Sequence, residues 1–173
     1  MTVLETERLI LRRLTMGDAA FILKLLNEPS FLRYIGDKNV RTLEDARNYI
    51  LTGPVASYKQ HGFGLYMLEL KQPKTLIGMC GLIKREGLPD PDIGFALIPD
   101  FWNKGLAFEA SAALLNDAQE RLKLPRILAI TSLDTESSIK LLERLGLTFQ
   151  DVIRLSPERE QVKLFKRELL RDE

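Results

Sequence analysis

A turn between an apolar run and an amphipathic segment holds the residues whose types and spacing best suit chemistry. Residues 102–107 read Trp, Asn, Lys, Gly, Leu and Ala. They follow the short apolar run 93–98, which is bounded by prolines and is typical of a buried strand. Apolar residues then recur at three-to-four spacing, which predicts a helix from near Gly105 to about Lys123.

The start of this helix has the properties of an anion-binding site. The first backbone N–H groups of a helix have no intrahelical partner and carry the positive end of the helix dipole. Gly105 has no Cβ that would keep a ligand away from the backbone, and Lys104 adds a positive charge beside it. The turn is therefore predicted to bind a phosphate group.

This turn resembles the pyrophosphate loop of the GNAT N-acetyltransferases, which use acetyl-CoA. That loop is usually written Gln/Arg-x-x-Gly-x-Gly/Ala, and here Trp102, Gly105 and Ala107 take its three defining positions. The Trp, the Phe-Glu-Ala of residues 108–110 and the opening segment 4–18 are similar to the branch that contains RimJ and RimL, the ribosomal-protein N-terminal acetyltransferases. These matches occur in the expected order and span most of the chain.

The resemblance implies a fold and a set of cofactor contacts. The expected fold is an α/β GNAT domain over residues 1–173, with a mixed, mostly antiparallel sheet of about seven strands, helices on both faces and a slot between two central parallel strands. Acetyl-CoA is the implied co-substrate. Its expected contacts are Leu97, Ile98, Trp102, Asn103, Lys104, Gly105, Leu106, Ala107, Thr135, Ser138 and Arg144.

Some of these contacts have specific roles in the family. Backbone N–H near Leu97 is expected to hold the oxyanion where the strand bulges, and Gly94 would permit that bulge. Thr135 stands where relatives carry an Asn that hydrogen-bonds the pantetheine arm, and it offers only a shorter hydroxyl. Lys140 and Arg144 are candidates to meet the 3′-phosphate, the alternative being solvated charges on an exposed helix face.

Two residues are candidates for proton transfer. Asp92 begins the strand where several relatives carry a Glu general base, so we expect it to accept the amine proton through a water. The alternative is that Asp92 ends the preceding loop or pairs with a basic neighbour. Many relatives use a Tyr acid at the position of Leu142, and the resemblance to RimL gives that role to Ser138. The alternative for Ser138 is a helix N-cap.

The resemblance implies a primary amine as acceptor, and a protein N-terminal α-amine is favoured. An α-amino group titrates near 7.7–8.0 and a lysine near 10.4, so roughly a tenth of an α-amine is already neutral at pH 7. The alternatives are a small amine (polyamine, amino acid or aminoglycoside), a non-catalytic acyl-CoA sensor, and a plain α/β domain that binds no nucleotide. Arg33 and Tyr34 lie in a segment that borders the acceptor groove in the family; the alternative is a surface Arg and a half-buried Tyr.

Composition limits the other classes of function. The 173 residues are 45% hydrophobic and 28% charged, which suits one globular domain. With 25 basic and 24 acidic residues the net charge is +1, so no general nucleic-acid surface is expected. One Cys and one His exclude an internal disulfide and make a zinc site improbable, and no metal is expected. No signal peptide or long apolar span is visible, so we expect a cytoplasmic protein without a membrane partner, either a monomer or a homodimer.

Periodicity predicts the remaining elements. Cys80 lies inside an apolar strand and is expected to be a core residue. The helix expected after residue 42 is disturbed at Gly53-Pro54, which leaves a kink or two short helices open. The other predicted elements are strand 8–14, a helix over 21–26 capped by Asp18, the hairpin 63–70 with 76–84, strand 126–131, helix 139–145 and the hairpin 147–155 with 161–167.

Overall fold

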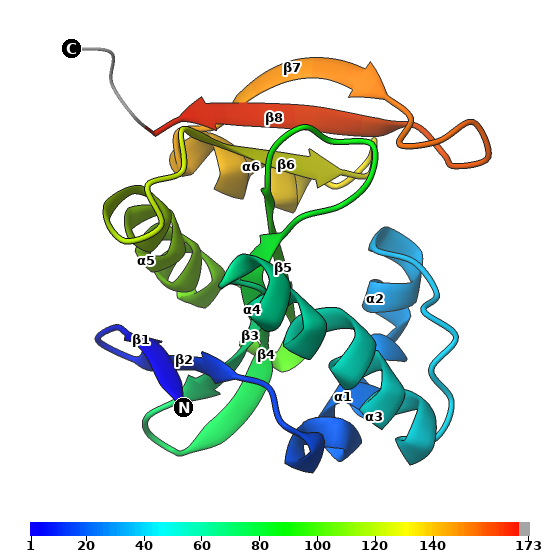
Figure 1. Cartoon of the computed structure of the whole chain (residues 1–173), viewed down its shortest axis with the longest axis vertical. Helices are drawn as coiled ribbons and strands as arrows, with labels where there is room; N and C mark the ends of the chain where they lie inside the picture. Colours follow the sequence, from blue (N-terminus) through cyan, green and yellow to red (C-terminus); the bar gives the residue numbers. More distant parts are fainter. Residues whose placement is uncertain (170–173) are drawn as a thin grey trace.

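An eight-stranded sheet organises residues 1–169, the part of the chain that the computed structural model describes (Figure 1). The strand order is β1-β2-β3-β4-β5-β6-β8-β7. Only β5 and β6 are parallel neighbours, so the expected mixed, mostly antiparallel sheet is confirmed. The strands are β1 (Thr2–Glu5), β2 (Leu9–Arg13), β3 (Leu65–Leu70), β4 (Thr75–Ile83), β5 (Asp92–Leu97), β6 (Arg126–Thr131), β7 (Thr148–Ile153) and β8 (Val162–Glu168).

The strand beyond the expected seven is β1. It pairs antiparallel with β2, and the backbone N–H of Arg13 donates to the carbonyl of Met1 at 3.1 Å. Four residues are too few to show a clear alternation of apolar and polar side chains, so this strand depends on its neighbour for stability.

Most helices belong to the part of the chain that connects β2 to β3. They are η1 (Met16–Asp18), α1 (Ala19–Leu26), α2 (Pro29–Tyr34), α3 (Leu43–Ile50), the π-helical segment η2 (Leu51–Val55) and α4 (Ala56–His61). Pro54 lies inside η2, so the disturbance expected there takes the form of a π-helical link between two α-helices. Later elements are η3 (Pro99–Phe101), α5 (Leu106–Glu120) and α6 (Glu136–Arg144), and α5 ends three residues before the expected Lys123.

The two faces of β5 belong to different cores. Ile93 and Leu97 pack in the core that contains α5 and α6, and Phe95, which packs against the same core, lies opposite Cys80 in the β4–β5 register. The Sγ of Cys80 is 3.6 Å from the Oγ of Ser111 in α5, and burial raises the pKa of this thiol to about 12, as suits a core residue. Ala96 packs with α1 and α3 instead. Because side chains alternate along a strand, Asp92 shares this second face.

The parallel strands β5 and β6 meet at one position and then separate. Their register is the single pair Asp92 and Leu128, with the N–H of Leu128 donating to the carbonyl of Pro91 at 3.0 Å. In Figure 1, β6, β8 and β7 turn away from β5 beyond this point. The divergence of two central parallel strands is the expected arrangement.

The bulge expected near Gly94 is absent. The register between β4 and β5 is unbroken from Asp92 to Leu97, so β5 remains regular. The separation from β6 therefore comes from the path of β6 and its partner β8, and the bulge prediction was wrong.

Candidate cofactor and acceptor site

The turn between β5 and α5 has the geometry that its glycine predicts. Gly105 is the N-cap of α5 with φ of 76°, a left-handed conformation that glycine adopts without strain, and Asn103 also has a positive φ of 60°. The carbonyl of Gly105 accepts the first intrahelical bond, from the N–H of Glu109 at 3.0 Å. The remaining N–H groups of the first turn point out of the helix start, where a phosphate would bind.

Trp102 connects this turn to the end of β5. Its Nε1 donates to the carbonyl of Leu97 at 2.9 Å, while the indole stays 43% exposed. The N–H of Ile98 donates to Ile77 on β4 at 2.8 Å, and because backbone directions alternate, the N–H of Leu97 points away from β4. The unusual Trp of the loop therefore satisfies the Leu97 carbonyl, and the Leu97 N–H faces the side on which β6 departs.

Glu109, in the first turn of α5, joins the loop to the beginning of the chain. Its Oε2 accepts from the Thr6 hydroxyl at 2.6 Å and from the Arg8 backbone N–H at 2.9 Å, and its Oε1 accepts from Arg8 Nε at 2.8 Å. Burial opposes ionisation of Glu109, but these hydrogen bonds outweigh it and hold the pKa of the carboxyl below its usual value. The carboxylate therefore supports the loop.

Arg8 also contacts the loop directly. Its Nη1 donates to the carbonyl of Lys104 at 3.0 Å, and its Nη2 lies 3.4 Å from the position that a Cβ on Gly105 would take. The guanidinium thus lies beside the predicted phosphate site, together with Lys104. Sequence reasoning placed Arg8 in the opening motif but did not connect it with the loop. Nothing within a single sequence links residues that lie 101 positions apart.

The start of α6 brings several hydroxyl groups near the end of β6. Thr135 is the N-cap of α6, but its Oγ1 hydrogen-bonds Ser132 and does not cap the helix. Ser138 lies inside the first turn, half-buried, so the N-cap position belongs to Thr135. Thr131, the last residue of β6, is only 8% exposed, and its Oγ1 has no partner among the described residues.

The two helices on this face approach each other at the loop. The guanidinium of Arg144, at the end of α6, lies 4.4 Å from the ring centroid of Phe108 in the first turn of α5. This contact places the positive charge of Arg144 within one helical turn of Gly105 along α5. The 3′-phosphate contact remains a prediction, and the structure gives the side chain a position from which to make it.

Asp92 forms a buried ion pair on the opposite face of β5. Arg85 binds both carboxylate oxygens, Nε to Oδ1 at 2.8 Å and Nη2 to Oδ2 at 2.9 Å, and Asp92 is 1% exposed. Burial raises the pKa of the Asp92 carboxyl, and the attraction of Arg85 acts in the opposite direction. This geometry matches the alternative in which Asp92 pairs with a basic neighbour.

Further cationic groups lie near Arg85, the ion-pair partner of Asp92. Desolvation, with repulsion from Arg85 and Arg159, lowers the pKa of the Lys38 ammonium. Burial raises the pKa of Tyr49 to about 12, while the nearby Arg85 favours its ionised form. Lys38 and Tyr49 line a cavity of about 200 Å³ between the α2–α3 loop and α3. Lys38 therefore lies near two further positive charges, those of Arg85 and Arg159.

The predicted substrate contacts Arg33 and Tyr34 lie on α2. Arg33 is 3.8 Å from Asp134, which precedes α6, and its guanidinium lies 4.8 Å from the Tyr34 ring centroid. Both members of this ion pair are largely exposed. The pair brings α2 near the start of α6, at the side of the molecule where β5 and β6 diverge.

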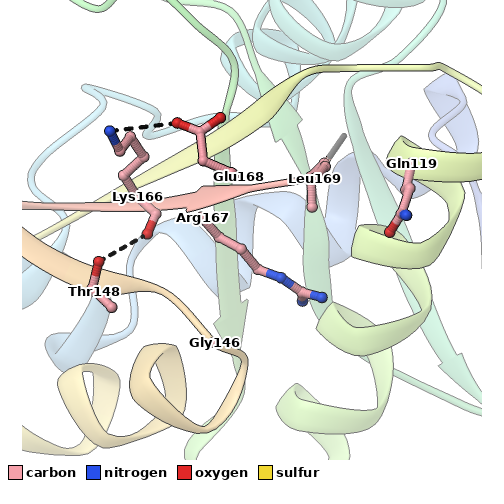
Figure 2. Close-up of a pocket in the computed structure, with 7 residues that line it drawn as sticks. All are labelled: Gln119, Gly146, Thr148, Lys166, Arg167, Glu168 and Leu169. Carbon is pink, nitrogen blue, oxygen red and sulfur yellow. Dashed lines mark hydrogen bonds and ion pairs between the residues drawn. The ribbon is translucent and has the colours of Figure 1, made fainter. Parts of the chain in front are cut away.

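A second cavity, of about 440 Å³, lies at the far end of α5 from Gly105 (Figure 2). In Figure 2, Lys166 and Glu168 point to one side of β8 and Arg167 to the other, where its Nη1 donates to the Leu145 carbonyl at 2.9 Å. No predicted site residue lines it. Its lining residues are Gln119, Gly146, Thr148, Lys166, Arg167, Glu168 and Leu169.

Residues 1–169 contain no group of three or more His, Cys, Asp or Glu side chains arranged to hold a metal ion. No helix within this range has the length and apolar character needed to cross a bilayer.

Comparisons with known proteins identify the relatives of this chain. A family model described as the acetyltransferase (GNAT) domain matches residues 8–148. A curated relative, the N-acetyltransferase YoaA of Bacillus subtilis, is 31% identical over 153 residues, which cover 88% of this chain and 86% of YoaA.

Solved structures share the fold over nearly the whole chain. An acetyltransferase from Agrobacterium tumefaciens has a TM-score of 0.81 at 25% identity and covers 97% of this chain and 95% of its own. RimL, a ribosomal L7/L12 α-N-protein acetyltransferase solved in complex with coenzyme A, has a TM-score of 0.77 at 15% identity, with 98% of each chain covered. At that identity the likeness to RimL shows the fold alone.

Proposed function

This chain is an acetyltransferase of the GNAT family, and on that basis we propose that it transfers the acetyl group of acetyl-CoA to a protein N-terminal α-amine. The observation that carries the cofactor half of the proposal is the helix start at Gly105, where Lys104 and Arg8 add positive charge beside unpaired backbone N–H groups. A buried hydroxyl without a partner, on Thr131, is a second feature that suits a bound ligand.

The loop residues would hold the cofactor. The N–H groups after Gly105 bind the pyrophosphate, with Trp102, Asn103, Lys104, Leu106 and Ala107 forming the rest of the loop. Arg144 meets the 3′-phosphate from α6. When bound, acetyl-CoA supplies an activated thioester. Leu97 and Ile98 then lie beside the arm, and the Leu97 N–H is placed to stabilise negative charge on the carbonyl oxygen.

Transfer requires a neutral amine and a protonated leaving thiolate. The amine nitrogen attacks the thioester carbon, the C–S bond breaks, the amine loses one proton and the sulfur gains one. We assign the first transfer to Asp92 through a water and the second to the hydroxyl of Ser138. An α-amine suits Asp92 in its ion pair with Arg85, because an amine that is partly neutral at pH 7 needs only a weak base.

The charges around Asp92 bear on the choice of acceptor. Lys38, Arg85 and Arg159 repel a second positive charge on the substrate, and this disfavours polyamines and aminoglycosides. A peptide N-terminus carries a single reactive amine. The same charges attract a carboxylate, so an amino acid is the second candidate acceptor.

A turnover assay with acetyl-CoA, read by release of free thiol, tests the proposal. The panel contains short peptides with free N-termini, amino acids, polyamines and aminoglycosides. Turnover confined to the peptides is the expected result, and turnover confined to amino acids moves the function to the second candidate. Binding of CoA without turnover on any amine contradicts the enzymatic proposal and favours an acyl-CoA sensor.

The roles of Asp92 and Ser138 have separate tests. Asp92→Asn is expected to remove the acid limb from the pH profile of kcat/KM, and an unchanged profile leaves Asp92 as the ion-pair partner of Arg85. Ser138→Ala is expected to lower kcat with little effect on stability, because Ser138 does not cap α6. A Ser138→Ala protein that loses stability but keeps its turnover contradicts the acid role.

A further inference from the structure

Thr131 has a buried hydroxyl that the folded chain leaves without a hydrogen bond. Among buried side-chain nitrogen and oxygen atoms in residues 1–169, only Arg13 Nε and Thr131 Oγ1 lack a partner. The Arg13 guanidinium lies 4.9 Å from the Tyr58 ring centroid, a contact that favours its charge. Thr131 has no such compensation. An unpaired buried hydroxyl costs stability, so its presence calls for a partner outside the chain.

The position of Thr131 places this hydroxyl where β5 and β6 have separated. Leu128 is the one residue of β6 in register with β5, and Thr131 follows it by three residues. Side chains alternate along a strand, so Thr131 shares a face with Ile127 and Ala129. Both of these pack in the core that contains α5 and α6. The hydroxyl therefore lies on the helix face that carries the Gly105 loop.

The hydroxyl expected to contact the cofactor arm here already has a hydrogen-bond partner within the chain. Thr135 stands at the position where relatives carry Asn, but its Oγ1 is hydrogen-bonded to the hydroxyl of Ser132. Of the threonines in this stretch, Thr131 is the one whose buried hydroxyl makes no hydrogen bond, so it can both donate and accept.

We propose that Thr131, and not Thr135, supplies the side-chain hydrogen bond to the amide-containing pantetheine arm of acetyl-CoA in this protein. The inference rests on the proposed use of acetyl-CoA. A cofactor that passes from the Gly105 loop into the divergence of β5 and β6 crosses the end of β6. There an amide of the arm completes the hydrogen bonding of Thr131, which makes Thr131 a binding and positioning residue.

The proposal predicts opposite effects of one substitution on the free and the bound protein. Thr131→Val keeps the shape of the side chain and removes the hydroxyl. The free protein should gain stability, with a melting temperature about 2–4 °C higher, because a buried unpaired group is lost. Affinity for CoA should fall about 3- to 10-fold, the equivalent of one hydrogen bond. Thr131→Ser, which keeps a hydroxyl, should retain most of the CoA affinity.

Titration calorimetry with two ligands shows which part of the cofactor Thr131 contacts. Adenosine 3′,5′-bisphosphate lacks the arm, so Thr131→Val should bind it as wild type does while binding CoA more weakly. Thr2→Val, the same change at an exposed position of the edge strand β1, is the matched control and should alter neither melting temperature nor affinity.

Each other outcome overturns the inference in a recognisable way. Equal CoA affinity of wild type and Thr131→Val refutes the role of Thr131 while leaving the cofactor assignment intact. Equal losses for CoA and the bisphosphate show a general distortion of the site. Failure of the wild-type protein to bind CoA refutes both the proposed function and this inference. Loss of CoA affinity in Thr135→Val but not in Thr131→Val returns the contact to the position used by relatives.

Discussion

Arg8 and Glu109 are joined by two hydrogen bonds across 101 positions of sequence, from the Arg8 backbone N–H to Oε2 at 2.9 Å and from its Nε to Oε1 at 2.8 Å. The same arginine donates to the carbonyl of Lys104 at 3.0 Å. One side chain from the segment before β2 thus contacts both the loop that precedes α5 and the first turn of α5. Several expected outcomes depend on this arrangement.

Replacing Glu109 should damage the loop. Glu109→Gln keeps the size of the side chain but removes the charge that receives three hydrogen bonds, so we expect a loss of about 1–3 kcal/mol in the free energy of unfolding. The KM for acetyl-CoA should rise more than kcat falls. The control is Glu5→Gln, which removes an exposed pair with Lys71 and should cost under about 1 kcal/mol. Equal effects of the two substitutions would contradict the special role of Glu109.

Ionised Glu109 should also contribute to the free energy of unfolding near neutral pH, and this contribution should be lost in acid. The hydrogen bonds from Thr6 and Arg8 lower its pKa in the folded protein below the model value of 4.5. A lowered folded pKa gives stability that is present above the unfolded pKa and is lost as pH falls through the folded pKa. The difference in free energy of unfolding between wild type and Glu109→Gln should therefore be constant near pH 7 and shrink below about pH 4.5. Urea titrations across this range measure it, and a difference that grows on acidification has the wrong sign.

The left-handed conformation of Gly105 should make any substitution at this position destabilising. Gly105→Ala places a Cβ on a residue with φ of 76°, which costs about 1–2 kcal/mol. The methyl group also lies between the helix start and a bound phosphate, so CoA affinity should fall by about tenfold or more, the equivalent of 1.4 kcal/mol. Gly53→Ala is the matched control, because Gly53 has open space around it and no positive φ. CoA titrations of both variants check this, and unchanged affinity in Gly105→Ala excludes phosphate binding at the turn.

The N–H of the Trp102 indole should contribute to stability and turnover through its hydrogen bond to the Leu97 carbonyl. Trp102→Phe leaves the Leu97 carbonyl without its donor while keeping an aromatic ring, so stability should fall by about 1 kcal/mol. Because the same residue shapes the strand end beside the Leu97 N–H, kcat should fall as well. Stopped assays at saturating acetyl-CoA check the second point, and a variant with wild-type kcat and stability shows that the hydrogen bond is dispensable.

The positive charge of Lys38 should govern which amines are accepted. Lys38→Gln removes one of the cations near Arg85, so kcat/KM for a polyamine should rise and that for an amino acid should fall, both by a few-fold and less so at high salt. Lys59→Gln, on the last turn of α4, is the control for a general change in net charge. If both substitutions shift the two substrates equally, Lys38 has no specific part in selection.

Local patterns were enough to predict the turn at Gly105 and the elements on either side of it. The strand at Asp92–Leu97, the left-handed glycine and the helix that follows all depend on neighbours in sequence, and the structure contains each of them. The mixed, mostly antiparallel sheet with two central parallel strands followed from the resemblance, because a single sequence carries no information about which strands pair.

Contacts between distant segments were not predictable from one sequence. Arg85 is one of many basic residues that had equal claim to pair with Asp92, and Glu109 gave no sign of its bonds to Thr6 and Arg8. The prediction of a bulge in β5, which Gly94 would have permitted, was wrong. A glycine permits an irregular strand without requiring one, and the unbroken pairing with β4 keeps β5 regular. The orphan hydroxyl of Thr131 depends on which groups surround it, which only the folded chain shows.

The single register pair between β5 and β6 has a mechanical consequence. Every other junction in the sheet carries at least three paired positions, so the described sheet consists of a five-stranded and a three-stranded part joined by a narrow seam and by packing of the helices. Under a pulling force applied across the strands, the sheet would tear at this seam first. A molecule bound between β5 and β6 would contact both parts of the sheet and raise the force needed to separate them.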